Sequence, residues 1–97
     1  MATILITAQI EPDQRHELVQ MCKSWLSDQL PSACLERRLY EDVIAPTHLL
    51  LAEEWSDDQA MNFYLSSEQF RAVVGAVKVL GKLINICIAQ VRVIEAG

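Results

Sequence analysis

The chain has 97 residues, of which 52% are hydrophobic and only 6% aromatic, and its formal net charge is −5 at pH 7. This length predicts a single domain, residues 1–97, built around one core. The acidic balance argues against a nucleic-acid partner, because a phosphate-binding surface needs a basic patch. The hydrophobic share is slightly above the usual globular value, which suggests that some apolar surface is buried between chains.

Three cysteines, Cys22, Cys34 and Cys87, are odd in number and form no CxxC pair. The first residues lead directly into a strand pattern and not into the basic and apolar regions of a signal peptide. The longest apolar-rich segment, around Val73–Val93, is interrupted by polar residues, so we expect no membrane span. We therefore expect a cytoplasmic protein with free, buried thiols.

The first half of the chain predicts a strand and a helix. Apolar residues alternate along Thr3–Ile10, which indicates a strand with one strongly apolar face. Pro12 between two acidic residues is typical of a first helical turn, and the helix should run to about Gln29. Its apolar stripe comprises Leu18, Met21, Cys22, Trp25 and Leu26.

A hairpin follows, with strands over Ala33–Asp42 and Thr47–Trp55. The second of these strands is apolar on both faces through Ala52, which is typical of a central strand. In the first strand, Leu35, Arg37 and Leu39 point one way, and Cys34, Glu36, Arg38 and Tyr40 point the other way. The acidic pair that ends the second strand, Glu53 and Glu54, should form cross-strand ion pairs with Arg37 and Arg38.

Two capping patterns, Ser56 with Gln59 and Ser66 with Gln69, predict two consecutive helices after the hairpin. The second helix carries an apolar stripe and should end at Gly81. The last strand is predicted over Ile86–Glu95. The stripe consists of Phe70, Val73, Val74, Val77 and Leu80.

The element order β-α-β-β-α-β, with the second helix split, predicts an α+β fold: a ferredoxin-like plait with a four-stranded antiparallel sheet. Its helices cover one face of the sheet only. The other face should carry apolar residues that need a cover. We therefore expect a homodimer that pairs through its sheet faces. The apolar residues expected on this face are Leu5, Leu50, Ile86, Ile88 and Ile94, or the alternate residues of a strand if its register slips.

Local patterns leave the chemistry open. No HxxxH or CxxC spacing supports a metal site, and the three glycines form no phosphate-binding loop. The polar row Glu36, Arg38 and Tyr40 is either a pocket wall or a solvated, dimer-facing row of charges. Trp55 is either a core residue or the lining of a cavity.

Three segments resemble the antibiotic biosynthesis monooxygenase (ABM) superfamily of small dimeric α+β barrel proteins. They are PSACLERRLYED, HLLLAEEW and SDDQAMNFYLSSEQFRAV. The resemblance implies a plait that dimerises through its sheets and holds a pocket between sheet and helices. It also implies oxygenation of quinols or polycyclic phenols without a cofactor, or haem degradation. Haem degradation is disfavoured, because Tyr64 and Val74 occupy the positions of that branch's tryptophan and histidine.

Two further departures from the family pattern bear on function: Ala33 replaces a glycine, and Gln69 replaces the histidine that usually precedes the phenylalanine. Two hypotheses therefore stay open. One is an ABM-type monooxygenase that acts on a small aromatic or quinol substrate. The other is a non-catalytic dimeric module that binds a small apolar or aromatic ligand. We expect no cofactor and no metal, and the residues expected to bind the substrate are Arg38, Tyr40, Trp55, Tyr64 and Gln69.

Overall fold

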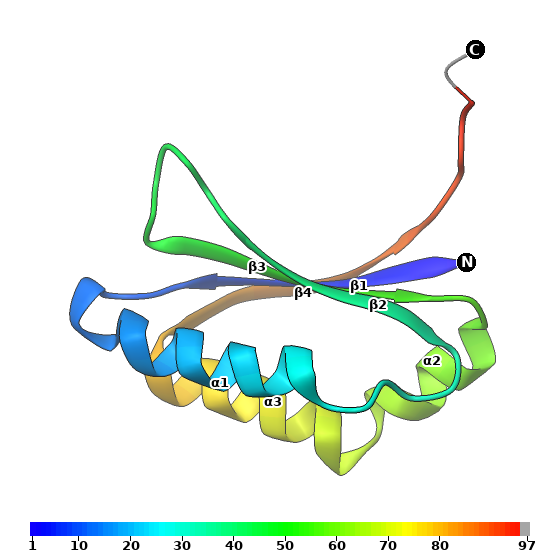
Figure 1. The fold of residues 1–97 in the computed structure, drawn as a ribbon, viewed down its shortest axis with the longest axis horizontal. Coiled ribbons are helices and arrows are strands. Elements are labelled where there is room, and N and C mark those ends of the chain that lie inside the picture. Colours follow the sequence, from blue (N-terminus) through cyan, green and yellow to red (C-terminus); the bar gives the residue numbers. More distant parts are fainter. Residues whose placement is uncertain (96–97) are drawn as a thin grey trace.

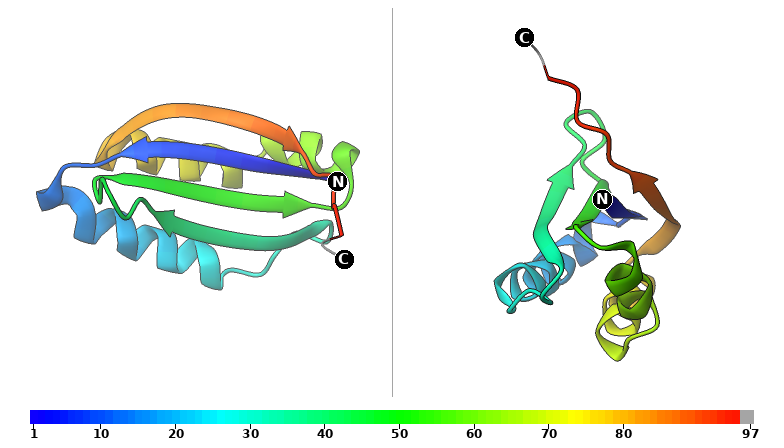
Figure 2. Two further views of the ribbon diagram at one scale, coloured as in Figure 1. Left: turned by 90° about the horizontal axis from the view of Figure 1, so that it is seen from above. Right: turned by 90° about the vertical axis from the view of Figure 1, so that its right-hand side faces the viewer.

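The computed structural model describes residues 1–95, which form an antiparallel sheet packed against helices. The strands are β1 (Ala2–Gln9), β2 (Cys34–Glu41), β3 (His48–Trp55) and β4 (Lys82–Gln90). The α-helices are α1 (Arg15–Ser27), α2 (Asp58–Leu65) and α3 (Glu68–Leu80), with a short 3-10 turn over Pro12–Gln14. The strand order is β2-β3-β1-β4, which confirms the ferredoxin-like plait (Figure 2).

The helices all lie on one face of the sheet, and no element among the described residues covers the opposite face (Figure 1). We call these the helix face and the open face. Burial alternates strictly along β1 and β3, as the period of a strand requires. The helix-face residues of β1 pack against α1 and α3, and each buried isoleucine contributes about 1.5–3 kcal/mol to stability.

Both helices after the hairpin begin one residue later than the sequence patterns predict. The N-cap of α2 is Asp57, which accepts from the backbone N–H of Gln59 at 3.1 Å. The hydroxyl of Ser56 instead donates to the carbonyl of Ala33 at 3.3 Å. The N-cap of α3 is Ser67, because Ser66 still ends α2. The predicted split of the second helix is confirmed, and Gly81 follows α3 as predicted.

The last strand was predicted at Ile86–Glu95, but β4 spans Lys82–Gln90. The length of β1 sets these limits, because β4 pairs with it from Gln9 opposite Lys82 to Ala2 opposite Gln90. The pairing contains a register shift between Thr7 and Ala8, and Asn85 lies opposite Thr7 within the strand.

The register of β4 also corrects the predicted composition of the open face. Directly paired residues share a face, so Ile86 and Ile88, opposite Ile6 and Ile4, lie on the helix side. Ile94 lies beyond the strand. Cys87 lies opposite Leu5 on the open face and is exposed, whereas Cys22 and Cys34 are buried as expected.

A register shift between Cys34 and Glu36 changes the faces of β2. Cys34 pairs with Trp55 and is buried, although the sequence placed it on the face of Glu36. Leu35 is left exposed at the irregularity. Such a bulge leaves one residue unpaired and redirects the side chains beside it.

None of the helices within residues 1–95 is long and apolar enough to cross a membrane.

Candidate functional site

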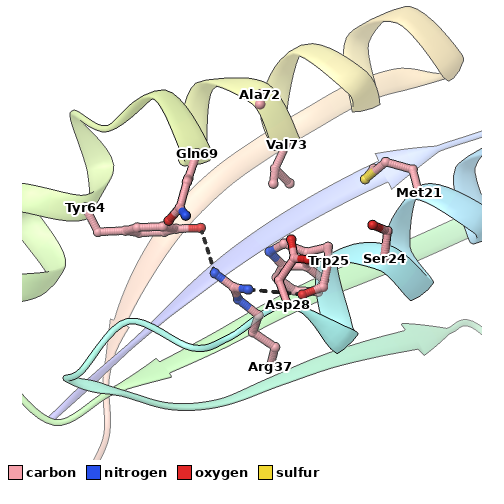
Figure 3. A pocket seen from close by; sticks show the side chains of 9 residues that line it. All are labelled: Met21, Ser24, Trp25, Asp28, Arg37, Tyr64, Gln69, Ala72 and Val73. Carbon is pink, nitrogen blue, oxygen red and sulfur yellow. Dashed lines mark hydrogen bonds between the residues drawn. The ribbon is translucent and has the colours of Figure 1, made fainter.

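A cavity of about 240 Å³ lies between the sheet and the helices. Residues from α1, β2, α2 and α3 surround it, so segments far apart in the sequence meet there (Figure 3). The walls combine an indole ring and aliphatic side chains with a few polar groups, which is the usual composition of a small-molecule site. The lining residues are Met21, Ser24, Trp25, Asp28, Arg37, Tyr64, Gln69, Ala72 and Val73.

Arg37 brings a buried cation to this cavity. It lies on the helix face of β2, and its side chain is only 4% exposed. Its Nε donates to Glu53 Oε2 at 3.0 Å, and Nη1 donates to the backbone carbonyl of Trp25 at 3.0 Å. Nη2 makes a longer contact of 3.5 Å with the hydroxyl of Tyr64. The guanidinium carbon also lies 5.2 Å from the centre of the Trp25 ring, within the range of a cation–π interaction.

Glu53 is directly opposite Arg37 across the β2–β3 pair, and its side chain is 1% exposed. Burial raises the pKa of Glu53 above its usual value, although the hydrogen bond and charge of Arg37 act in the opposite direction. For Arg37, burial lowers the pKa, but the hydrogen bond and charge of Glu53 raise it more, so its net pKa is above the usual value. The pair therefore holds a fixed, charge-balanced cation at the cavity wall.

An aromatic row extends from this ion pair. The rings of Trp55 and Tyr64 are 4.9 Å apart, and those of Tyr64 and Phe70 meet edge to face at 5.5 Å. Burial, together with the negative charge of Glu53, raises the pKa of Tyr64 well above its usual value. Its hydroxyl therefore stays protonated at neutral pH and can donate a hydrogen bond.

A second hollow, of about 490 Å³, lies on the other side of Tyr64 and Gln69, which line both spaces. It is more apolar than the first and is bordered by Trp55, Ala60 and Phe63. Tyr64 and Gln69 therefore separate the cavity from this more apolar hollow.

The five residues expected from the sequence to bind a substrate fall into two groups. Trp55, Tyr64 and Gln69 lie around the two adjoining spaces on the helix face. Arg38 and Tyr40 lie on the open face, where they line a separate hollow of about 330 Å³. The sheet separates the groups, so the structure does not bring all five together.

The expected ion pairs also form only in part. Arg37 pairs with Glu53, but Arg38 binds Glu36 of its own strand at 2.7 Å. Glu54 lies directly opposite Glu36. The ion pair of the polar row Glu36, Arg38 and Tyr40 is therefore formed within the row, and both of its partners are well exposed.

Sequence reasoning did not assign Trp25, Arg37 and Glu53 to the site. A signal was present in two of them, because each charge interrupts a row of otherwise apolar residues that the sequence predicts to share one face of the sheet. Arg37 stands between Leu35 and Leu39, and Glu53 follows Leu51 on its row. A buried charge of this kind is almost always paired.

Metal binding has no structural support in the described part of the chain, where no three His, Cys, Asp or Glu side chains gather as ligands.

Comparison with known proteins assigns the chain to a family. The family profile described as antibiotic biosynthesis monooxygenase (ABM) matches residues 1–76. A search of curated protein sequences finds no match. The structure defines a class of protein, a small α+β plait with a cavity between the sheet and the helices. The chain belongs to the ABM family.

Solved structures share the fold at low sequence identity. One is a protein from Deinococcus radiodurans described as a candidate antibiotic biosynthesis monooxygenase, with TM-score 0.68, 23% identity, and coverage of 99% of this chain and 95% of that chain. Another is a conserved protein from Methanosarcina mazei, with TM-score 0.74, 20% identity and coverage of 94% and 92%. A third, from Bacteroides thetaiotaomicron, is described as a possible oxidoreductase, with TM-score 0.77, 12% identity and coverage of 90% and 93%.

Proposed function

We propose that this protein is a cofactor-independent monooxygenase that acts on a small aromatic or quinol substrate bound in the helix-face cavity. Membership of the ABM family supports the reaction class. The observation that carries the proposal is a buried, immobilised Arg37 guanidinium at the wall of a cavity that is otherwise partly aromatic and aliphatic. Such a site can bind a flat apolar ring and orient one polar substituent.

The reaction requires little chemistry from the protein. An anthrone methylene, once deprotonated, is an electron-rich carbanion and enolate that can reduce oxygen directly. The substrate supplies all four electrons: one oxygen atom becomes the new carbonyl, and the other leaves as water. The protein must bind the ring, favour its ionised form and accept a proton. Asp28 lines the cavity and is a carboxylate that can accept this proton.

Oxygen uptake tests the proposal directly. The assay uses an oxygen electrode and a panel of anthrones and quinols, with product identification by mass spectrometry. We expect turnover of at least one substrate, and a large loss in Gln69→Ala, which removes an amide at the partition of the two spaces. Gln20→Ala makes the same change on the exposed side of α1 and serves as the control. Absence of uptake across the whole panel would exclude the oxygenase.

One observation favours a non-catalytic alternative. None of the 9 residues that line the cavity is a histidine, the group best suited to act as a base near neutral pH. A dimeric module that only binds a small apolar or aromatic molecule would use the same cavity. It would show ligand-induced thermal stabilisation, and the ligand would be recovered unchanged.

A further inference from the structure

An apolar hollow of about 340 Å³ lies between α3 and β4. It shares no lining residue with the two helix-face spaces described above. β4 is an edge strand, and α3 runs beneath it without covering it fully (Figure 2). Ile86 and Ile88, on the helix side of β4, are therefore still 37% and 45% exposed. We call this hollow the α3–β4 groove, and its apolar walls are Leu65, Phe70, Val74, Gly75 and Ile86.

Gly75 keeps the groove open. A Cβ added to Gly75 would have no atom within 4 Å, so even a small side chain there would extend into empty space. Glycine in the interior of a helix is unfavourable relative to alanine. The chain thus leaves an apolar surface uncovered and a helix position unfilled at the same place, and a bound molecule would explain both features.

The charged side chains of the groove are both positive. Arg71 and Lys78 line it from α3, and their seven-residue separation places them about 10 Å apart along the helix axis. The guanidinium of Arg71 donates through Nη1 to the carbonyl of Ser66 at 3.1 Å, which holds it in place and leaves other N–H groups unused. Neither cation forms an ion pair with a carboxylate of residues 1–95.

This positive charge contrasts with the rest of the surface. The chain carries a formal net charge of −5, and each of four other hollows within residues 1–95 has at least one aspartate or glutamate in its wall. No acidic side chain of the described residues lines the α3–β4 groove. An apolar molecule with a negative charge is therefore the complementary ligand.

We propose that the α3–β4 groove binds a soluble amphipathic anion, whose head group contacts Arg71 or Lys78 and whose aliphatic tail lies on the apolar walls. These walls are mainly aliphatic, which favours a hydrocarbon tail over a flat aromatic ring. The volume of about 340 Å³ fits one small molecule. A membrane surface does not fit, because the chain is acidic overall and anionic lipids would repel it.

Amide NMR spectroscopy of the isotope-labelled protein tests this site with octanoate and its neutral isostere octanamide. We expect saturable shifts of the backbone amides of Gly75 and Ile86 at millimolar octanoate, and no change at the indole N–H of Trp25, which reports the helix-face cavity. Octanoate should bind about threefold or more tightly than octanamide, the range of two exposed ion pairs. Decanoate should bind more tightly still, by up to about fourfold for each added methylene group.

Variants assign the binding to the groove. Gly75→Leu fills the groove and should abolish binding, whereas Val79→Leu adds apolar surface at an exposed position of α3 outside the groove and should not change it. Lys78→Gln should weaken octanoate binding about two- to fivefold and leave octanamide binding unchanged. Lys23→Gln removes the same charge from the exposed side of α1 and should have no effect.

The proposal is wrong if octanoate causes no saturable shifts at millimolar concentration, if it shifts only the indole signal of Trp25, or if octanamide binds equally well. It is also wrong if the amides of the groove shift when the ligand-free protein is diluted, because a second copy of the chain then covers the groove. If Gly75→Leu does not fold, the pair Lys78→Gln and Lys23→Gln still decides whether the groove binds the anion. None of these measurements uses oxygen uptake, so this site and the monooxygenase activity are confirmed or refuted independently.

Discussion

Replacing Arg37 by methionine should destabilise the fold strongly, and the loss should grow with pH. Methionine preserves an unbranched apolar side chain but leaves the Glu53 carboxylate, 1% exposed, without its cation. Breaking a buried ion pair from one side typically costs about 3–5 kcal/mol. A domain of this size has a total free energy of unfolding of about 5–15 kcal/mol. We therefore expect the variant to lose about a fifth or more of its stability at pH 8.

The pH dependence follows from the protonation of Glu53. Burial already raises the pKa of Glu53, and Arg37 opposes this shift, so removing Arg37 must raise that pKa further. The folded state then binds the proton more tightly than the unfolded state. The free energy of unfolding consequently falls as the pH rises from the unfolded pKa through the folded pKa. Each additional pH unit in this window costs about 1.4 kcal/mol. The deficit of Arg37→Met should thus be small near pH 5 and largest near pH 8.

This effect can be measured by urea denaturation at pH 5, 6, 7 and 8 and at a fixed protein concentration. The fluorescence of the two buried tryptophans reports the unfolding. Arg71 provides a matched control, because it is exposed on α3, on the opposite side of the molecule from the open face. Arg71→Met should not shift the denaturation midpoint resolvably. A deficit of Arg37→Met that is independent of pH, or no larger than that of Arg71→Met, would refute the reasoning.

Two further predictions concern packing and assembly. Gly81→Ala should destabilise the protein by about 1–3 kcal/mol, because the added Cβ would lie 2.8 Å from the carbonyl oxygen of Gln9. Gly75→Ala, with no atom within 4 Å of its Cβ, should instead stabilise α3 by about 0.5–1 kcal/mol, and thermal unfolding compares the two. We also propose that two copies pair through their open faces, so alkylation of the exposed Cys87 should slow as protein concentration rises. Cys22 should stay unreactive throughout, because burial raises its pKa to about 11. A rate for Cys87 that does not change with concentration, together with a monomeric mass by light scattering, would contradict the dimer.

Much of the fold could be predicted from the sequence, because burial imposes a local period. The alternation in β1 and β3 and the stripe in α3 each identify the inward side of one element without reference to any other. Three of the expected site residues, Trp55, Tyr64 and Gln69, lie around the helix-face spaces for the same reason. Trp55 and Tyr64 lie on the buried sides of their elements and Gln69 lies in the first turn of α3, and the spacing of apolar and capping residues along the chain indicates all three positions.

The register of a strand depends on its partner and is not a local property. The errors in the predicted faces of β2 and β4 arose from register. The limits of β4 depend on the length of β1, which moved Ile86 and Ile88 from the open face to the helix side. The irregularity in β2 buried Cys34 and exposed Leu35, since one unpaired residue reverses the alternation before it.

The sequence by itself determined the order of the elements, the inward rows of β1, β3 and α3, and the possibility of a cross-strand pair between Arg37 and Glu53. Only the tertiary structure decided that this pair is buried, that Trp25 from α1 joins it, and that Arg38 binds Glu36 on the other face. The physical reason is that periodicity fixes the direction of a side chain within its own element. Which partner it meets depends on how strands align and which face the helices cover.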